Sequence, residues 1–162
     1  MITECSTVSF ETSLGRLSIR GTPRGILAVT FGVEETTEDS NLFPFLEQCL
    51  HEMEEYFSGN RRAFSVPLVM RGTDFQQRVW DALLEIPFGQ TVTYGQLAKE
   101  IGHPGAARAV GTAVGDNPLA IIVPCHRVLP ATGGIGEYAS GSDRKEWLLK
   151  HEGVEMSSFL KA

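Results

Sequence analysis

Hydrophobic and polar residues alternate along the first part of the chain with a period of two, which is typical of half-buried strands. Val8 and Phe10 precede the pair Leu14-Gly15, and Leu17 and Ile19 follow it. This arrangement predicts a β-hairpin over residues 8–19. The same alternation predicts further strands at residues 26–31 and at Phe64, Val66 and Leu68.

Two segments show the spacing of an amphipathic helix. Apolar residues recur every three or four positions between residues 41 and 57, and Gly59 follows as a helix end. Thr73 and Gln76 have the spacing of a capping box, which predicts a helix from there to just before Pro87. The predicted buried residues are Leu42, Phe45, Leu46, Cys49, Met53, Tyr56 and Phe57 in the first helix, and Phe75, Val79, Ala82, Leu83 and Ile86 in the second.

A helix-turn-helix pattern comes next. Thr93 and Gln96 form a second capping box, and Gly102 is placed to end the first helix. The second helix spans residues 106–114. It has an apolar face and, on the opposite side, a face of small residues with one cation, Arg108. Such a face can approach a nucleic-acid backbone, but it lacks the long polar side chains that read bases in the major groove. The alternative is that two short helices simply pack tightly together.

The change from strands to helices at Arg71-Gly72 indicates two domains. We predict an α/β (α+β) fold with a strand-rich N-terminal domain at residues 1–71 and a helical C-terminal domain at residues 72–162. The acidic segment at residues 34–40 is predicted to be a solvated loop. The segment at residues 129–142 is rich in Gly, Ala and Ser, which suits a lid whose backbone lines a pocket.

An apolar run at residues 119–123 leads directly to a thiol and an imidazole. The run is rich in β-branched residues and too short to span a membrane, which favours an interior strand or an extended segment. Pro124 ends regular strand pairing. We therefore expect Cys125 on a rigid corner, with His126 beside it.

Cys125 is the candidate nucleophile. A free cysteine has a pKa near ~8.5 and is mostly protonated at neutral pH, so it needs a neighbouring base or cation. His126 is the candidate base, but adjacent residues of an extended chain point to opposite sides. We therefore expect a water to bridge the two side chains. The competing interpretation is a buried, unreactive cysteine.

The last predicted helix supplies a carboxylate. Residues 143–152 form a helical pattern that is expected to bury Trp147 and Leu148. Glu152 then stands at the helix C-terminus, where a negative charge is unfavourable unless a cation meets it. This position predicts that Glu152 is the partner of His126.

The composition is that of an ordinary globular protein, with 42% hydrophobic and 21% charged residues. Residues 1–10 lack the pattern of a secretory signal, and there is no apolar run of ~18 residues, so we expect a cytoplasmic protein, or a nuclear one in a eukaryote. The net charge of -6 argues against a polybasic surface. Any contact with DNA must depend on backbone amides, helix ends and a few placed cations.

Cysteine usage and short motifs point to no cofactor. Cys5, Cys49 and Cys125 fit reduced thiols inside a cell. Cys49 and His51 are two residues apart on a predicted helix and face different sides, so we predict no metal site there. Phosphate-binding loops and dinucleotide fingerprints are absent from the sequence.

Several motifs in order resemble a known family. Asn117-Pro118 followed by Pro-Cys-His-Arg-Val at residues 124–128 is similar to the active-site signature of the O6-alkylguanine-DNA alkyltransferases, or methylguanine-DNA methyltransferases. The resemblance implies a ribonuclease H-like N-terminal domain and a monomer that binds double-stranded DNA through the minor groove, with little sequence preference and no cofactor. It extends over Gly72-Thr73-Asp74-Phe75-Gln76, Tyr94-Gly95-Gln96-Leu97-Ala98, Ala107-Arg108-Ala109-Val110-Gly111 and His151-Glu152-Gly153.

The resemblance also implies roles for individual residues. It implies DNA repair by irreversible, single-turnover transfer of an alkyl group from O6-alkylguanine, or O4-alkylthymine, to Cys125. His126 would act through water as the base, Glu152 would complete the relay and Asn117 would brace the turn. Arg108 would fill the stack vacated by a flipped base. The implied DNA contacts are Tyr94, Arg108, Thr93, His103, Gly111 and Ala131, and the implied base pocket is Tyr94, Val114, Val128, Tyr138, Ala139 and Ser140.

Two other classes of function stay open. A non-catalytic lesion sensor or DNA-binding regulator can use the same scaffold. The alkyltransferase-like sensors, however, lack a cysteine at the position of Cys125. A cysteine hydrolase can use Cys125, His126 and Glu152, but it leaves the helix-turn-helix without a purpose.

Overall fold

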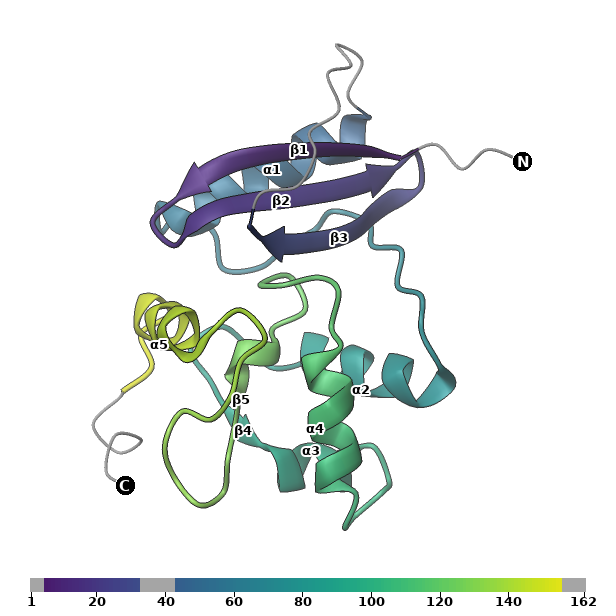
Figure 1. Ribbon diagram of the computed structural model, residues 1–162, viewed down its shortest axis with the longest axis vertical. Coiled ribbons are helices and arrows are strands. Elements are labelled where there is room, and N and C mark those ends of the chain that lie inside the picture. Colours follow the sequence, from purple (N-terminus) through teal and green to yellow (C-terminus); the bar gives the residue numbers. More distant parts are fainter. Residues whose placement is uncertain (1–4, 33–42, 156–162) are drawn as a thin grey trace. The chain divides into compact units, whose positions relative to one another are not determined.

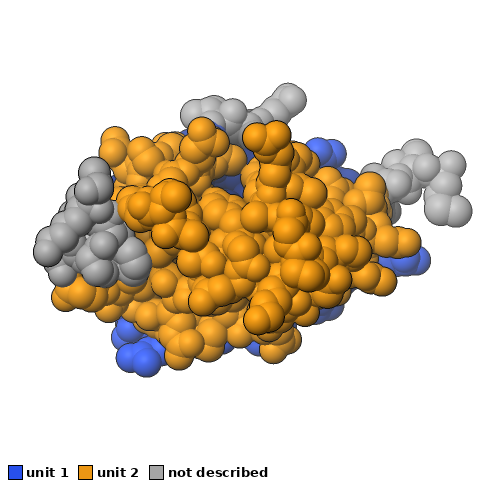
Figure 2. Space-filling model, turned by 90° about the horizontal axis from the view of Figure 1, so that it is seen from below, with its two compact units in different colours: residues 1–70, 118–122 blue, residues 71–117, 123–162 orange. Residues whose placement is uncertain are grey.

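A computed structural model describes residues 5–32 and 43–155, and it divides into two compact units. Unit 1 comprises residues 1–70 and 118–122, and unit 2 comprises residues 71–117 and 123–162, shown in blue and orange in Figure 2. The chain therefore leaves unit 1 after Met70 and returns to it for five residues. The acidic loop predicted at residues 34–40 lies outside the described residues.

Unit 1 contains a three-stranded antiparallel sheet in the order β1-β2-β3. The strands are β1 (Ser6–Thr12), β2 (Gly15–Thr22) and β3 (Gly25–Phe31), so the predicted hairpin and the strand after it are confirmed. Helix α1 (Pro44–Phe57) runs along one face of the sheet (Figure 1). The core between them contains Leu17, Ile19, Ile26, Val29, Leu46, Cys49, Met53 and Tyr56, all buried.

The strand predicted at residues 64–68 is wrong. Only Leu68 makes a β-bridge, with Ile26, and Pro67 has no N–H to extend the pairing. The backbone N–H groups of Ser65 and Val66 donate instead to the carboxylate of Glu52, at 3.0 and 3.3 Å. The buried Glu52 side chain of α1 thus binds the backbone N–H groups that would otherwise pair with a neighbouring strand.

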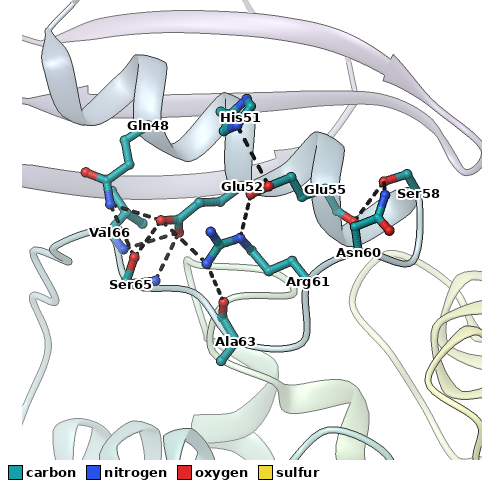
Figure 3. A network of polar contacts seen from close by, with 10 residues as sticks. All are labelled: Gln48, His51, Glu52, Glu55, Ser58, Asn60, Arg61, Ala63, Ser65 and Val66. Carbon is teal, nitrogen blue, oxygen red and sulfur yellow. Dashed lines mark hydrogen bonds and ion pairs between the residues drawn. The ribbon is translucent and has the colours of Figure 1, made fainter.

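Glu52 organises this part of unit 1 (Figure 3). Its carboxylate is buried and also accepts hydrogen bonds from Gln48 Nε2 at 2.9 Å and Ser65 Oγ at 2.7 Å, with Arg61 Nη1 at 3.8 Å. Burial acts to raise the pKa of Glu52, but the hydrogen bonds from Gln48, Ser65 and Val66 outweigh it and lower that pKa. The ionised carboxylate therefore fastens the segment after α1 to the helix.

We predict that Glu52→Gln destabilises the protein by about 2–4 kcal/mol at pH 7, because the amide faces four donors with one acceptor oxygen. Because the pKa of Glu52 is lowered on folding, its contribution is present above the ordinary carboxyl pKa of 4.5 and is lost as the pH falls. Urea unfolding measures the change. The exposed Glu54→Gln on the same helix is the control, and equal small losses in both variants contradict the prediction.

The buried run was predicted as an interior strand or an extended segment. It forms a single bridge and then a tight turn, so the predicted strand is wrong. Leu119 pairs with Val29 at a single β-bridge, since Val29 N donates to Pro118 O at 2.9 Å and Ala120 N donates to Val29 O at 3.1 Å. The backbone then turns at Ile121, whose φ of 72° lies in the left-handed region. That conformation is rare for a β-branched residue and reverses the chain direction.

Unit 2 contains the helices α2 (Asp74–Leu84), α3 (Tyr94–Glu100) and α4 (Ala107–Gly115). Both predicted capping boxes are present, because Thr73 and Thr93 each exchange hydrogen bonds with the residue three positions on. Trp80 Nε1 donates to Ala113 O at 2.9 Å and joins α2 to α4. The small face of α4 and the predicted turn at Gly102, which has φ 84°, are also as expected.

The rest of unit 2 carries the candidate chemistry. A 3-10 turn, η1 (Cys125–Arg127), leads into β5 (Val128–Leu129), which pairs in parallel with β4 (Val92–Thr93). Helix α5 (Ser142–His151) follows a loop at residues 130–141. Its buried side chains are Lys145, Leu148 and Leu149, whereas Trp147 is only half-buried and stacks on His151 at 4.8 Å. The prediction that Trp147 is buried is therefore wrong.

Among residues 5–32 and 43–155, no helix combines the length and apolar character needed to cross a membrane.

Candidate active site

The corner that carries Cys125 is built by Pro124. With φ -81° and ψ 66°, Pro124 occupies the middle of an inverse γ-turn, and Cys125 N donates to Val123 O at 2.8 Å. The Asn117 side chain donates to the same Val123 oxygen at 2.7 Å. Asn117 therefore braces the turn before the thiol, which is the geometry expected from the sequence.

Parallel pairing of β4 with β5 brings Tyr94 close to Cys125. Val92 pairs with Val128, and Tyr94 begins α3 directly after β4. Burial raises the pKa of the Tyr94 hydroxyl, and the nearby Cys125 and Glu137 raise it further. The short strands thus place the Tyr94 ring near the thiol, although the two residues are far apart in sequence.

His126 and Glu152 form a buried pair. His126 Nε2 lies 2.8 Å from Glu152 Oε2, and both side chains are fully buried. Burial acts to raise the pKa of Glu152, but hydrogen bonds and charge from His126 and Arg127 lower it far below its ordinary value. The ionised carboxylate can only accept a hydrogen bond, so Nε2 carries the proton and donates it. The pairing predicted from the helix end is confirmed.

This tautomer leaves Nδ1 of His126 with its lone pair free to accept a proton. Nδ1 is buried and has no hydrogen-bond partner within the described residues. It therefore makes no direct hydrogen bond to the neighbouring thiol of Cys125. Burial lowers the pKa of His126 below 6.5, and the charges of Arg127 and Lys145 add to this effect against the pull of Glu152. The imidazole is therefore a neutral base at physiological pH.

The thiol itself is protonated at rest. Burial raises the pKa of Cys125 above 9.0, while a hydrogen bond from Asn117, the charge of Lys145 and the Tyr138 hydroxyl act to lower it. Burial together with Cys125 raises the pKa of Tyr138, so this hydroxyl stays protonated and can donate a proton. A neutral thiol beside a neutral imidazole becomes a nucleophile only when the proton moves between them.

Comparison with known proteins identifies the family. Residues 74–154 match the model of the 6-O-methylguanine DNA methyltransferase DNA binding domain, and residues 7–70 match the model of the ribonuclease-like domain of the same proteins. The chain belongs to the 6-O-methylguanine DNA methyltransferase family. The resemblance noted in the sequence is thereby confirmed, as is the α/β fold class.

Relatives and solved structures of this family cover nearly the whole chain. A methylated-DNA–protein-cysteine methyltransferase of Methanosarcina acetivorans is 46% identical over 149 residues, which are 89% of this chain and 96% of the relative. The crystal structure of the Mycobacterium tuberculosis O6-methylguanine methyltransferase has a TM-score of 0.82 at 42% identity, covering 92% of this chain and 93% of its own. A structure of the M. tuberculosis protein in complex with DNA has a TM-score of 0.81 at 42% identity, covering 90% and 91%.

Two site residues of this family member were missed from the sequence. Arg127 donates from Nε to Glu152 Oε1 at 2.7 Å and from Nη2 to Glu152 Oε2 at 3.0 Å. Lys145 is fully buried and donates to Val128 O at 2.7 Å and to the Glu137 carbonyl at 3.2 Å. Burial lowers the pKa of Lys145 to about 8. The spacing of Lys145 with Leu148, Leu149 and Glu152 on one helical face was the available signal.

The other residues implied by the family resemblance lie elsewhere in unit 2. Thr93 uses its hydroxyl to cap α3. A Cβ added at Gly111 would lie 3.7 Å from the Tyr94 ring, in ordinary van der Waals contact with it. His103 is exposed and contacts the edge of Phe75. Arg108, Ala131 and Ala139 are exposed, Ser140 is half-buried, and Val114 and Val128 are buried.

Metal ligands do not gather in the described part of the chain. No group of three His, Cys, Asp or Glu residues there is arranged to hold a metal ion. Cys49 is buried in the core, and burial with the nearby charge of Glu52 raises its pKa to about 12, whereas His51 is exposed. The two residues face different sides of α1, as their spacing predicted.

Proposed function

We propose that this protein repairs DNA as a methylated-DNA–protein-cysteine methyltransferase and that Cys125 receives the alkyl group from O6-alkylguanine. The single observation that carries the residue assignment is the buried contact of 2.8 Å between His126 Nε2 and the Glu152 carboxylate. His126 Nε2 donates to an ionised Glu152, so Nδ1 of the same ring is a base beside the thiol. The relatives named above have this activity in their names, and the two family models match residues 7–70 and 74–154.

The proposed reaction uses these groups in turn. The proton of the Cys125 thiol passes through a bridging water to Nδ1 of His126, and Glu152 stabilises the imidazolium that forms. The thiolate electron pair then forms a bond to the alkyl carbon, and the bond from that carbon to guanine O6 breaks. A proton donor neutralises the departing guanine oxygen, and we assign this role to the buried Tyr138 hydroxyl near Cys125. The thioether product is stable, so one molecule repairs one lesion.

We propose that DNA lies against the helix-turn-helix of unit 2. The base must leave the duplex to reach a buried thiol, which costs a few kcal/mol of stacking. Arg108 is exposed on the small face of α4 and can fill the vacated stack, while Tyr94 lies between this helix and Cys125. Thr93, His103, Gly111 and Ala131 complete the proposed contact with the minor groove, where few side chains read sequence.

We propose that the loop after β5 closes the base pocket. Lys145 joins its two sides by binding the carbonyls of Val128 and Glu137. The pocket residues are then Tyr94, Val114, Val128, Tyr138, Ala139 and Ser140. We also place the protein in the cytoplasm, or in the nucleus of a eukaryote, because the proposed chemistry requires a reduced thiol and the described cysteines are all free.

We predict that Arg108→Ala slows repair of O6-methylguanine in duplex DNA by about tenfold, because each 1.4 kcal/mol of lost stacking is a factor of ten. Reaction with the free base O6-benzylguanine stays unchanged, since no stack has to be filled. Single-turnover kinetics on both substrates measure the difference. Lys99→Ala removes an exposed charge from α3 as the control. Equal losses on both substrates mean that Arg108 serves the pocket or the fold instead.

The proposed function is tested by stoichiometry. Excess duplex DNA with one O6-methylguanine is incubated with the protein, and the remaining lesion is counted. A transferase removes one lesion per protein molecule and then stops. A sensor binds the DNA and removes none, and an enzyme that hydrolyses the adduct continues through many turnovers. Either of the last two outcomes contradicts the proposal.

A further inference from the structure

We propose that Arg127 is a positioning residue for alkyl transfer, which fixes the carboxylate of Glu152 against His126 and keeps His126 uncharged before the reaction. This inference rests on the proposed function of the same site. Sequence reasoning assigned no role to Arg127. Its side chain nonetheless donates two hydrogen bonds to the carboxylate of Glu152.

Arg127 holds the carboxylate from the side. Nε binds one oxygen of Glu152 and Nη2 binds the other, so the carboxylate plane is fixed relative to the guanidinium plane. The guanidinium is itself anchored, because Nη1 donates to Ile86 O at 2.5 Å and the Phe88 ring lies 5.9 Å from its carbon. The turn after α2 therefore sets the direction from which Glu152 meets His126.

One oxygen of the carboxylate serves two donors. Glu152 Oε2 accepts from Arg127 Nη2 at 3.0 Å and from His126 Nε2 at 2.8 Å. The short turn η1 supplies both donors, because His126 and Arg127 are consecutive residues of it. His126 and Arg127 can therefore approach the same carboxylate at the end of α5.

Charge balance gives Arg127 its second effect. A buried carboxylate beside an imidazole favours the imidazolium, because two opposite charges then face each other in a medium of low dielectric constant. Arg127 already neutralises Glu152, so the site gains little by protonating His126. The other groups near His126 act in the same direction or are uncharged, namely the Lys145 ammonium and the Cys125 thiol. Nδ1 consequently stays free to accept the thiol proton.

The test compares two substitutions that separate charge from geometry. Arg127→Met removes the charge but keeps an unbranched, apolar chain, and Arg127→Lys keeps the charge but cannot hold both oxygens. Arg78→Met removes a charge from an exposed position of α2 and is the matched control. For each variant, nitrogen NMR follows the His126 imidazole through a pH titration without DNA, and the His126→Gln spectrum assigns the signals. Single-turnover transfer is then measured across the same pH range.

In Arg127→Met, His126 is expected to take up its proton at a pH about one unit higher or more, since Glu152 has lost its other partner. For a one-unit rise, transfer at pH 7 falls by up to about threefold, and it recovers as the pH rises because the base form returns. In Arg127→Lys, the His126 titration is expected to stay near that of the wild type, while transfer falls severalfold at every pH. Arg78→Met matches the wild type in both measurements.

An unchanged His126 titration in Arg127→Met overturns the inference, as does a rate loss that is the same at every pH. If Arg127→Met does not fold, Arg127→Lys decides, and wild-type transfer in that variant removes Arg127 from the positioning of Glu152. The imidazole titration involves no alkylated DNA. The titration therefore tests the role of Arg127 even if the wild-type protein transfers no alkyl group. Absence of wild-type transfer contradicts the proposed function and is a separate result.

Discussion

Cys125→Ser is expected to abolish alkyl transfer completely while lesion binding persists. A serine hydroxyl has a far higher pKa than a thiol and is a poor nucleophile towards an alkyl carbon, so the neighbouring neutral imidazole cannot activate it. The oxygen is close to sulfur in shape, and the hydrogen bond from Asn117 to Val123 is independent of the substitution. The variant should therefore behave as a sensor that holds O6-methylguanine DNA without repairing it.

The same change at another cysteine provides the control. Cys5 lies at the start of unit 1, outside the proposed site, and Cys5→Ser should transfer at the wild-type rate. Gel-shift titration measures lesion binding, and loss of O6-methylguanine measures repair. If Cys125→Ser still repairs the lesion and Cys5→Ser does not, Cys125 is excluded as the acceptor.

Glu152→Gln is expected to slow transfer by on the order of 10²-fold, since the base loses the group that orients it and stabilises its protonated form. Stability should fall by about 3–5 kcal/mol at pH 7, because the buried guanidinium of Arg127 is left without a counter-charge. The pKa of Glu152 is lowered on folding, so this contribution is present above the ordinary carboxyl pKa of 4.5 and disappears as the pH falls. The difference between wild type and variant should shrink in acid.

Glu146→Gln on the same helix separates this effect from a general loss of charge. Glu146 pairs with Lys150 at the surface, at 3.2 Å, and exposed pairs contribute ~1 kcal/mol or less. Urea unfolding and single-turnover transfer are measured for both variants at pH 7 and pH 4. A Glu152→Gln protein with wild-type transfer contradicts a role for Glu152 in the relay.

Elements with strong local signals were predictable from the sequence. The two capping boxes begin helices where Thr73 and Thr93 stand, since both partners of each box lie within one turn. The hairpin of β1 and β2 follows from local alternation. The pairing of Glu152 with His126 was predictable because a carboxylate at a helix C-terminus requires a partner.

Features that depend on distant partners were not predictable. The alternation at residues 64–68 resembles a strand, but Glu52 captures the backbone of Ser65 and Val66. The run at residues 119–123 is apolar enough for a strand, yet it is buried as a single β-bridge followed by a turn. Arg127 was missed because its partners come from the ends of α2 and α5, which no local pattern connects.

The central claim is that the sulfur of Cys125 takes the alkyl group. The most direct measurement is the mass of the tryptic peptide from Ala109 to Arg127 after reaction with duplex DNA containing O6-methylguanine. We predict that this peptide gains one methyl group, that fragmentation places it on Cys125, and that the peptides with Cys5 and Cys49 are unchanged. Repair of the lesion with an unmodified Cys125, or a methyl group on another residue, contradicts the account.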